Sequence, residues 1–206
     1  MKVFIHKIMI LLATFWLVFP AVAKATAPDQ LVRSTVDEVI TILKQDDGIK
    51  KGSKDRVLDL IETKILPHFN FTRMTRLAMG KNWSKAEPQQ QKVLVSEFQT
   101  LLVRTYSNAL TNYRDEVIEV TPATPQPDAR NTTVKTRVIQ GRGREPVPID
   151  YTMEKTDKGW KVYDVTVAGV SLVTNYRSSF NSEIRKTGVD GLIATLVKKN
   201  KSLEGQ

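Results

Sequence analysis

The 206-residue sequence has no cysteine and only two histidines, His6 and His68. Without cysteine the fold cannot depend on a disulfide, and thiolate catalysis is excluded. A metal or catalytic site at His68 would need partners at ligand spacing, and its sequence neighbours offer none. Gly-rich phosphate loops, nucleophile elbows and paired carboxylates are also missing from the sequence. These absences favour a binding or structural role over catalysis.

The longest apolar run lies at the start of the chain. Two lysines precede the almost wholly apolar residues 8–22, and Ala21-Val22-Ala23 matches a small-x-small cleavage site. This pattern predicts a secretory signal peptide over residues 1–23, and the alternative is an uncleaved membrane anchor. Residues 24–206 are then expected to form a single domain.

Positive charge exceeds negative charge along the chain. The 31 lysines and arginines stand against 22 aspartates and glutamates, which gives a net charge of +9. A basic, exported, cysteine-free domain indicates the bacterial periplasm, where positive charge favours anionic lipids or acidic proteins over nucleic acid. Gly141-Arg142-Gly143-Arg144 resembles a fragment of an RNA-binding tract, but one hairpin-sized instance is better explained as a solvated turn.

Apolar residues at helical spacing predict four helices in the first half of the chain. Ser84 is the predicted N-cap of the long fourth helix, and Glu87 is expected to complete a capping box with it. The four helices are predicted to begin at Pro28, Ser53, Asn70 and Ser84 and to end near Gly48, Pro67, Gly80 and Tyr113.

The apolar period changes to two after residue 115, which predicts an antiparallel sheet. Two further helices follow the sheet, separated by a break at Thr187-Gly188. Helices packed on one face of such a sheet give an α+β fold. The predicted strands cover residues 116–121, 130–140, 147–155 and 160–167.

Asp164 is the one fair candidate for acid–base chemistry, because it lies in the middle of an apolar strand. Alternation places it with Thr166 and opposite Tyr163 and Val165. The favoured interpretation is that Asp164 is a structural carboxylate that accepts hydrogen bonds from a nearby helix N-terminus.

The apolar faces can be explained in two ways. Helical and strand stripes ordinarily pack against each other, so the residues alone favour a filled core over a ligand cavity. The tyrosines among them are compatible with a pocket whose mouth is wet.

Several short motifs follow one another along the mature chain. They are Leu66-Pro67 with Phe69, Leu77-Ala78-Met79-Gly80 running to Trp83, Phe98 with Leu102 and Tyr106, Trp160-Lys161-Val162-Tyr163-Asp164-Val165, Gly169-Val170-Ser171-Leu172-Val173, Asn175-Tyr176-Arg177, and Lys186-Thr187-Gly188-Val189-Asp190-Gly191-Leu192-Ile193. In this order and spacing they resemble the MlaC, or toluene-tolerance, family of periplasmic phospholipid-binding shuttles of Gram-negative bacteria. The resemblance covers nearly the whole mature chain.

The resemblance implies a nuclear-transport-factor-2-like cone, in which N-terminal helices pack on a curved antiparallel sheet, C-terminal helices follow, and an apolar cavity is enclosed. It implies a carrier, not an enzyme, that holds the acyl chains of a diacyl glycerophospholipid. From the residues themselves no metal, cofactor or nucleic acid is expected, and a monomer is expected because no apolar stripe is left over to demand a permanent dimer. The partners it implies are an inner-membrane ABC-transporter complex and an outer-membrane lipoprotein/porin complex. The implied role is to maintain lipid asymmetry of the outer membrane.

With this resemblance the apolar faces become predicted pocket walls. A charge at Val173 or Leu102 is expected to abolish phospholipid co-purification while leaving the fold intact. Trp160 stays unassigned, because alternation places it opposite Tyr163 unless a β-bulge intervenes. An isomerase or dehydratase that uses Asp164, and an adaptor with a filled core, are the alternatives. The predicted lipid-binding residues are Leu94, Phe98, Leu101, Leu102, Tyr106, Val138, Ile149, Tyr151, Met153, Tyr163, Val165, Val173 and Tyr176.

Overall fold

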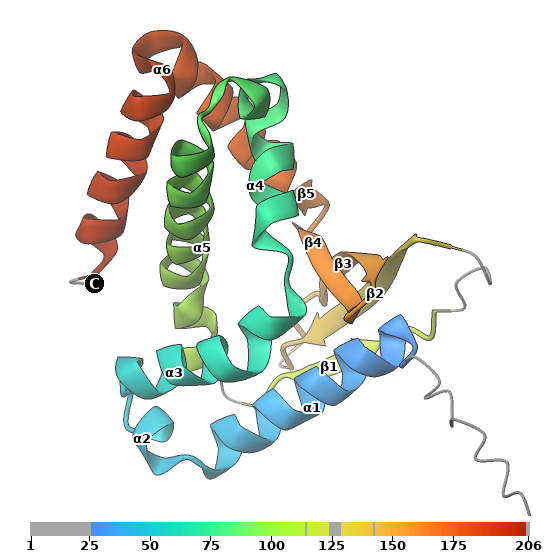
Figure 1. Ribbon diagram of the computed structural model, residues 1–206. Coiled ribbons are helices and arrows are strands. Elements are labelled where there is room, and N and C mark those ends of the chain that lie inside the picture. Colours follow the sequence, from blue (N-terminus) through green and yellow to red (C-terminus); the bar gives the residue numbers. More distant parts are fainter. Residues whose placement is uncertain (1–25, 114, 124–128, 142, 205–206) are drawn as a thin grey trace, which may run out of the picture.

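The computed structural model describes residues 26–113, 115–123, 129–141 and 143–204 (Figure 1). The predicted signal peptide lies outside these residues, so its cleavage stays a prediction. Helices precede and follow one antiparallel sheet, which confirms the α+β expectation. No helix in the described part of the chain is long and apolar enough to cross a membrane.

The first helix lies along one side of the sheet, and the short helices that follow it lead away from the sheet. Helix α1 (Pro28–Gln45) lies beside strand β1 (Val117–Val120) in Figure 1, and the short helix α2 (Asp47–Lys50) leads into α3 (Lys54–Leu60). Ser53 is the N-cap of α3, as predicted, and its hydroxyl accepts the Arg56 N–H at 3.5 Å. Beyond Leu60 the helix widens into a π-helical turn, Ile61–Ile65, and then tightens into a 3₁₀ turn, Leu66–His68. The predicted second helix is therefore three different helical segments.

Helices α4 (Phe71–Met79) and α5 (Pro88–Thr111) form a hairpin. Asn70 caps α4, as predicted, by accepting the Arg73 N–H at 3.0 Å. The prediction that Ser84 caps α5 is wrong, because a 3₁₀ segment, Gly80–Lys85, contains Ser84. The N-cap is Glu87, whose N–H donates to the Gln90 side chain at 2.9 Å. The proline that follows Glu87 suits the first helical position, where no backbone N–H is needed.

The sheet has five antiparallel strands in the order β1-β2-β3-β4-β5. Each strand therefore pairs with its neighbour in sequence. The strands are β1 (Val117–Val120), β2 (Asn131–Ile139), β3 (Val147–Thr156), β4 (Gly159–Val167) and β5 (Val170–Ser171). Between β4 and β5 the chain reverses at Ala168 and Gly169, which have positive φ angles of 48° and 84°.

A β-bulge in β4 changes which side chains share a face. Thr152 pairs with Asp164 but Met153 pairs with Val162, so Tyr163 is an extra residue on β4. The bulge places Val162 on the face of the sheet that carries Met153 and Val165. The prediction that Tyr163 shares a face with Val165 is therefore wrong. Tyr163 instead lies under the Arg73 guanidinium, whose carbon is 3.5 Å from the ring centroid.

The last helix, α6 (Leu172–Glu204), begins at a carboxylate cap. Asp164 accepts the Ser171 hydroxyl at 2.6 Å and the Val173 N–H at 3.1 Å. The prediction of a structural Asp164 at a helix N-terminus is thus confirmed. The predicted break at Gly188 is also present, because this residue has non-helical angles (φ 75°, ψ −172°) that glycine tolerates best.

Buried apolar side chains fall into three clusters. The helical cluster joins α4, α5 and α6, the sheet cluster joins α1 to the inner face of the sheet, and the α1–α3 cluster joins the first helices. Phe98, Val134 and Val57, respectively, are among their most buried members. The clusters surround a space that is not filled by side chains.

We expect Asp164→Ala to lower the free energy of unfolding by about 1–3 kcal/mol, because the Val173 N–H and the Ser171 hydroxyl lose their acceptor. Urea unfolding measures this change. Asp150→Ala is the matched control, since Asp150 lies opposite Thr166 on the neighbouring strand. Equal stability of the two variants would contradict the capping role.

Candidate functional site

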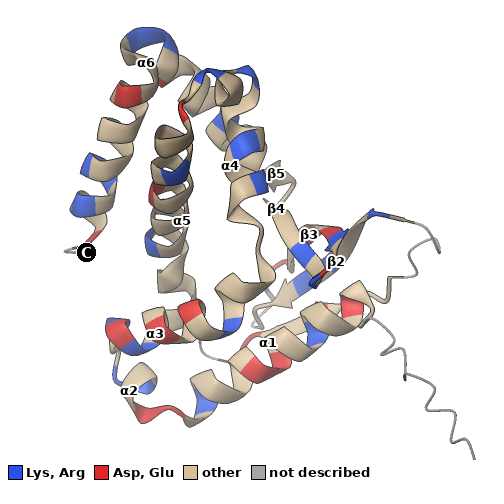
Figure 2. Ribbon diagram, in the orientation of Figure 1, with Lys and Arg blue, Asp and Glu red and all other residues tan. Residues whose placement is uncertain are grey.

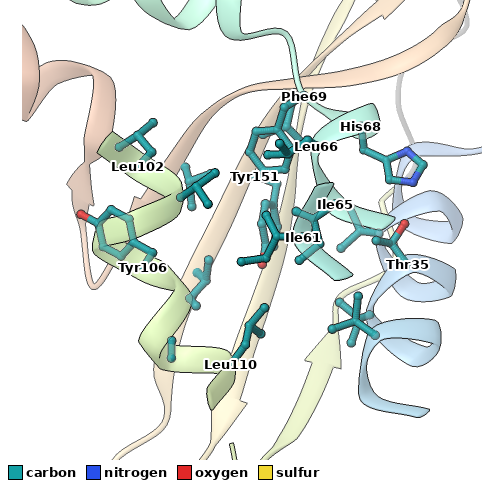
Figure 3. A pocket seen from close by; sticks show the side chains of 18 of the residues that line it. Thr35, Ile61, Ile65, Leu66, His68, Phe69, Leu102, Tyr106, Leu110 and Tyr151 are labelled. Carbon is teal, nitrogen blue, oxygen red and sulfur yellow. The ribbon is translucent and has the colours of Figure 1, made fainter. Parts of the chain in front are cut away.

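An apolar pocket of about 450 Å³ opens where the three clusters meet (Figure 3). Helix α1 forms one wall, and the segment from Ile61 to Met74 forms the next. The second half of α5, from Leu102 onward, faces them across the space together with Tyr113 just after the helix. The inner face of β3 and β4 lies behind, with Tyr151 at its centre in Figure 3.

The lining is apolar almost throughout. Among its 29 described residues there is no aspartate, glutamate, lysine or arginine. Such a wall suits hydrocarbon chains, because removing apolar surface from water lowers the free energy and requires no directional contacts. The polar groups of the lining are neutral ones, and they belong to Thr35, His68, Tyr106, Ser107, Tyr113 and Tyr151.

The tyrosines differ in their surroundings. Burial raises the pKa of Tyr151, so its hydroxyl stays neutral at ordinary pH. Tyr113 donates a hydrogen bond to the Glu116 carbonyl at 3.0 Å. Tyr106 is 42% exposed, and its hydroxyl points away from Tyr151 and Ile61 in Figure 3. Tyr106 therefore marks a side of the pocket that water reaches.

The structure brings six of the thirteen predicted lipid-binding residues together in this pocket. Two come from α5 and four from the sheet, on the strands that carry the predicted greasy face. They are Leu102, Tyr106, Ile149, Tyr151, Met153 and Val165.

Five of the other seven lie in the helical cluster. The Phe98 ring meets the Tyr176 ring edge-on at a centroid distance of 5.0 Å. Val173 is only 4% exposed there, so a charge at this position would disturb the helical core and would not test the pocket. The five residues are Leu94, Phe98, Leu101, Val173 and Tyr176.

The last two predicted residues belong to the sheet but do not line the pocket. Val138 pairs with Ile118 on β1 and with Val147 on β3, which places it on the inner face of the sheet. Tyr163 is turned away by the bulge and packs against the helical cluster. Trp160 lies on the inner face of the sheet, where it packs with Val162 in the buried sheet cluster.

The predicted lipid-binding residues include none from α1 or from the segment after Leu60, so the sequence analysis missed two walls. The available signal was the breadth of the apolar face on α1, which is wider than contact with one neighbour needs. The π-helical turn has no comparable signal in the sequence. The lining residues of α1 are Leu31, Val32, Val36, Val39, Ile40 and Leu43.

Charged side chains stay outside the pocket. Glu154 is held by Arg73 at 2.5 Å and by the Asn70 amide at 2.7 Å on the other side of the sheet. Lysine and arginine outnumber acidic residues on α4 and α6, whereas α1 and α3 carry several acidic residues (Figure 2). Charge is therefore distributed unevenly over the surface, whereas the described lining of the pocket carries no acidic or basic residue apart from His68.

Asp164, the candidate general base, does not line this pocket. Both of its carboxylate oxygens accept hydrogen bonds at the start of α6. Within the described residues, no three histidine, aspartate or glutamate side chains gather in a way that could hold a metal ion.

Comparison with known protein families decides the relationship. The family model described as MlaC protein matches residues 33–198. The chain belongs to the MlaC family. The predicted resemblance is therefore confirmed.

Two curated relatives match most of the chain. The intermembrane phospholipid transport system binding protein MlaC of Haemophilus influenzae is 23% identical over 185 residues, which are 89% of this chain and 86% of that protein. The toluene tolerance protein ttg2D of Pseudomonas putida is 28% identical over 184 residues, which are 89% of this chain and 83% of that protein.

A solved structure shares the fold. It is the phospholipid-binding protein of Ralstonia solanacearum in complex with a phospholipid, and its TM-score to this MlaC chain is 0.81. The two sequences are 36% identical, and the alignment covers 87% of this chain and 99% of the other.

His68, which lies in the pocket wall, makes the stability of the folded protein depend on pH. Burial lowers the pKa of its imidazole below 6.5, the nearby positive charge of Lys161 lowers this pKa further, and Glu38 opposes the shift. In the unfolded chain the imidazole takes up a proton near pH 6.5, whereas in the folded chain it does so only at lower pH. As the pH falls through this window, the unfolded state binds more protons and the folded state loses stability.

We expect His68→Gln to lose less stability than the wild type when the pH falls from about 7.5 to about 5.5, across the ordinary histidine pKa. Urea unfolding at both pH values measures the two differences. The two proteins share every carboxylate, so other titrations cancel in the comparison. Identical losses in both proteins would show that His68 does not contribute.

Proposed function

We propose that this protein binds a diacyl phospholipid with its acyl chains in the apolar pocket and carries it between membranes. The observation that carries the proposal is the pocket lining, which brings helix and strand side chains together without one charged residue among those described. The phospholipid named in the Ralstonia solanacearum complex, and the phospholipid transport named for the Haemophilus influenzae relative, support this choice of cargo.

The proposed setting is the periplasm. Residues 1–23 would act as a cleaved signal peptide that directs export of the protein to this compartment. There the protein would exchange phospholipid, as a monomer, between an inner-membrane ABC-transporter complex and an outer-membrane lipoprotein/porin complex. The result would be maintenance of lipid asymmetry in the outer membrane. The family membership and the basic surface support this part of the proposal.

The energetics suit a carrier that must also release its cargo. Burial of one methylene group gains about 0.8 kcal/mol, so two acyl chains offer more free energy than the tightest known complexes use. A wall that is wet at Tyr106 and carries hydroxyl groups keeps part of that gain from being realised. Tails recognised by apolarity alone also leave the headgroup almost unselected.

Val165→Glu is expected to reduce the phospholipid that co-purifies with the protein by more than tenfold, because a carboxylate in the pocket would have to be desolvated by the acyl chains. Organic extraction followed by mass spectrometry measures the bound phospholipid. Val170→Glu is the matched control, since Val170 is 57% exposed on β5 and lines no part of the pocket.

Circular dichroism confirms that both variants are folded. Val165→Trp is a second variant that fills the pocket without adding charge, and it should also lower the phospholipid content. Wild-type protein without bound phospholipid, or Val165 variants with undiminished phospholipid, would overturn the proposal.

A further inference from the structure

A second recess, of about 400 Å³, lies on the other side of the segment from Leu66 to Thr72. The side chains of Leu66, Phe69 and Phe71 line both this recess and the apolar pocket. The two spaces therefore adjoin along these three residues. The rings of Phe69 and Phe71 stack at this border, with centroids 5.6 Å apart.

The recess differs from the pocket in its chemistry. Its lining contains two lysines, Lys158 from the β3–β4 turn and Lys161 from β4. Thr72 and Gln99 add a hydroxyl and an amide from the facing helices. The apolar pocket has no cation among its described lining residues, so the two neighbouring spaces form an apolar and a polar compartment.

The carboxylates near the recess do not neutralise its lysines. Glu154, which pairs with Lys161 across the strands, accepts hydrogen bonds from Arg73 and Asn70. Asp157 lies exposed in the turn beside Lys158. Within the described chain, neither lysine takes part in an ion pair.

A purely structural role explains only part of this arrangement. The Lys161 ammonium donates to the Pro67 carbonyl and so ties β4 to the segment that borders both spaces. This contact uses one of three ammonium hydrogens, and it does not account for Lys158 or for the recess between them.

We propose that the recess binds the phosphate group of a phospholipid whose acyl chains occupy the apolar pocket. This inference rests on the proposed function. Lys158 and Lys161 supply the positive charge, and the rim of Leu66, Phe69 and Phe71 is where the glycerol backbone crosses from one compartment to the other. Since every glycerophospholipid has this phosphate, the site distinguishes phospholipid from neutral diacylglycerol without distinguishing headgroups.

Delipidated protein is titrated with the brominated derivatives of dioleoyl phosphatidylglycerol and of dioleoylglycerol, whose bromine atoms quench tryptophan fluorescence. Trp160 packs beside Val162, which lines the pocket, and so reports binding of either lipid. We expect Lys158→Glu to weaken phosphatidylglycerol binding about tenfold or more, because one charge-assisted contact is replaced by repulsion. Binding of dioleoylglycerol should not change.

Lys158→Gln combined with Lys161→Gln should act in the same direction without adding negative charge. The control is Lys199→Glu, an equal change of charge on α6 that lines neither space, and it should leave both affinities unchanged. Addition of salt should reduce the preference for phosphatidylglycerol over dioleoylglycerol in the wild type.

Three results would overturn the proposal. Equal binding of the two lipids by the wild type would remove the phosphate site but leave the lipid carrier intact. Equal losses for both lipids in Lys158→Glu would show a general effect on the pocket. Inorganic phosphate that binds the lysines while the lysine variants keep full phosphatidylglycerol affinity would reassign the recess to a free anion. Failure of the wild type to bind either lipid would instead reject the proposed function itself.

Discussion

The separation of buried apolar side chains into three clusters is the constraint on which the pocket depends. The clusters share elements, since α1 contributes to the sheet cluster and the α1–α3 cluster, and α5 packs in the helical cluster and against the α1–α3 cluster. Hydrogen bonds tie α5 to the end of α6: Arg104 donates to the Asn200 carbonyl at 2.5 Å, and the Asn200 amide donates to Glu97. Closing the gap would bury the hydroxyls on its wall away from water, at about 1–3 kcal/mol for each group left without a partner.

Most of the fold follows from the sequence, because hydrophobic period and capping residues report local geometry. Ser53, Asn70, Gly188 and Asp164 all act where their chemistry predicts. Ser84 was a poor guide because two capping boxes compete within a few residues, and the proline after Glu87 decides between them. Pro88, at the first helical position, was the local signal that the Ser84 prediction overlooked.

The site was harder to predict than the fold. Ile149, Tyr151 and Val165 were found because alternation along a strand fixes the face on which a side chain lies. Phe98 and Val173 have the same apolar periodicity as true wall residues, yet they pack within the helical cluster. Whether an apolar stripe meets another stripe or a gap depends on how distant elements are placed, and the period of one segment does not contain that placement.

The bulge at Tyr163 shifts by one residue the alternation of inward-facing and outward-facing side chains along β4. Before it, Trp160 and Val162 face inward on even positions; after it, Val165 faces inward on an odd one. One strand can thus keep its apolar side to the interior at both ends while offering an aromatic ring to the opposite layer in the middle. A strand of the same length without the bulge would lose either the outward-facing Tyr163 ring or the inward-facing apolar side chains at one of its two ends. The inserted residue lets β4 serve two layers of the molecule at once.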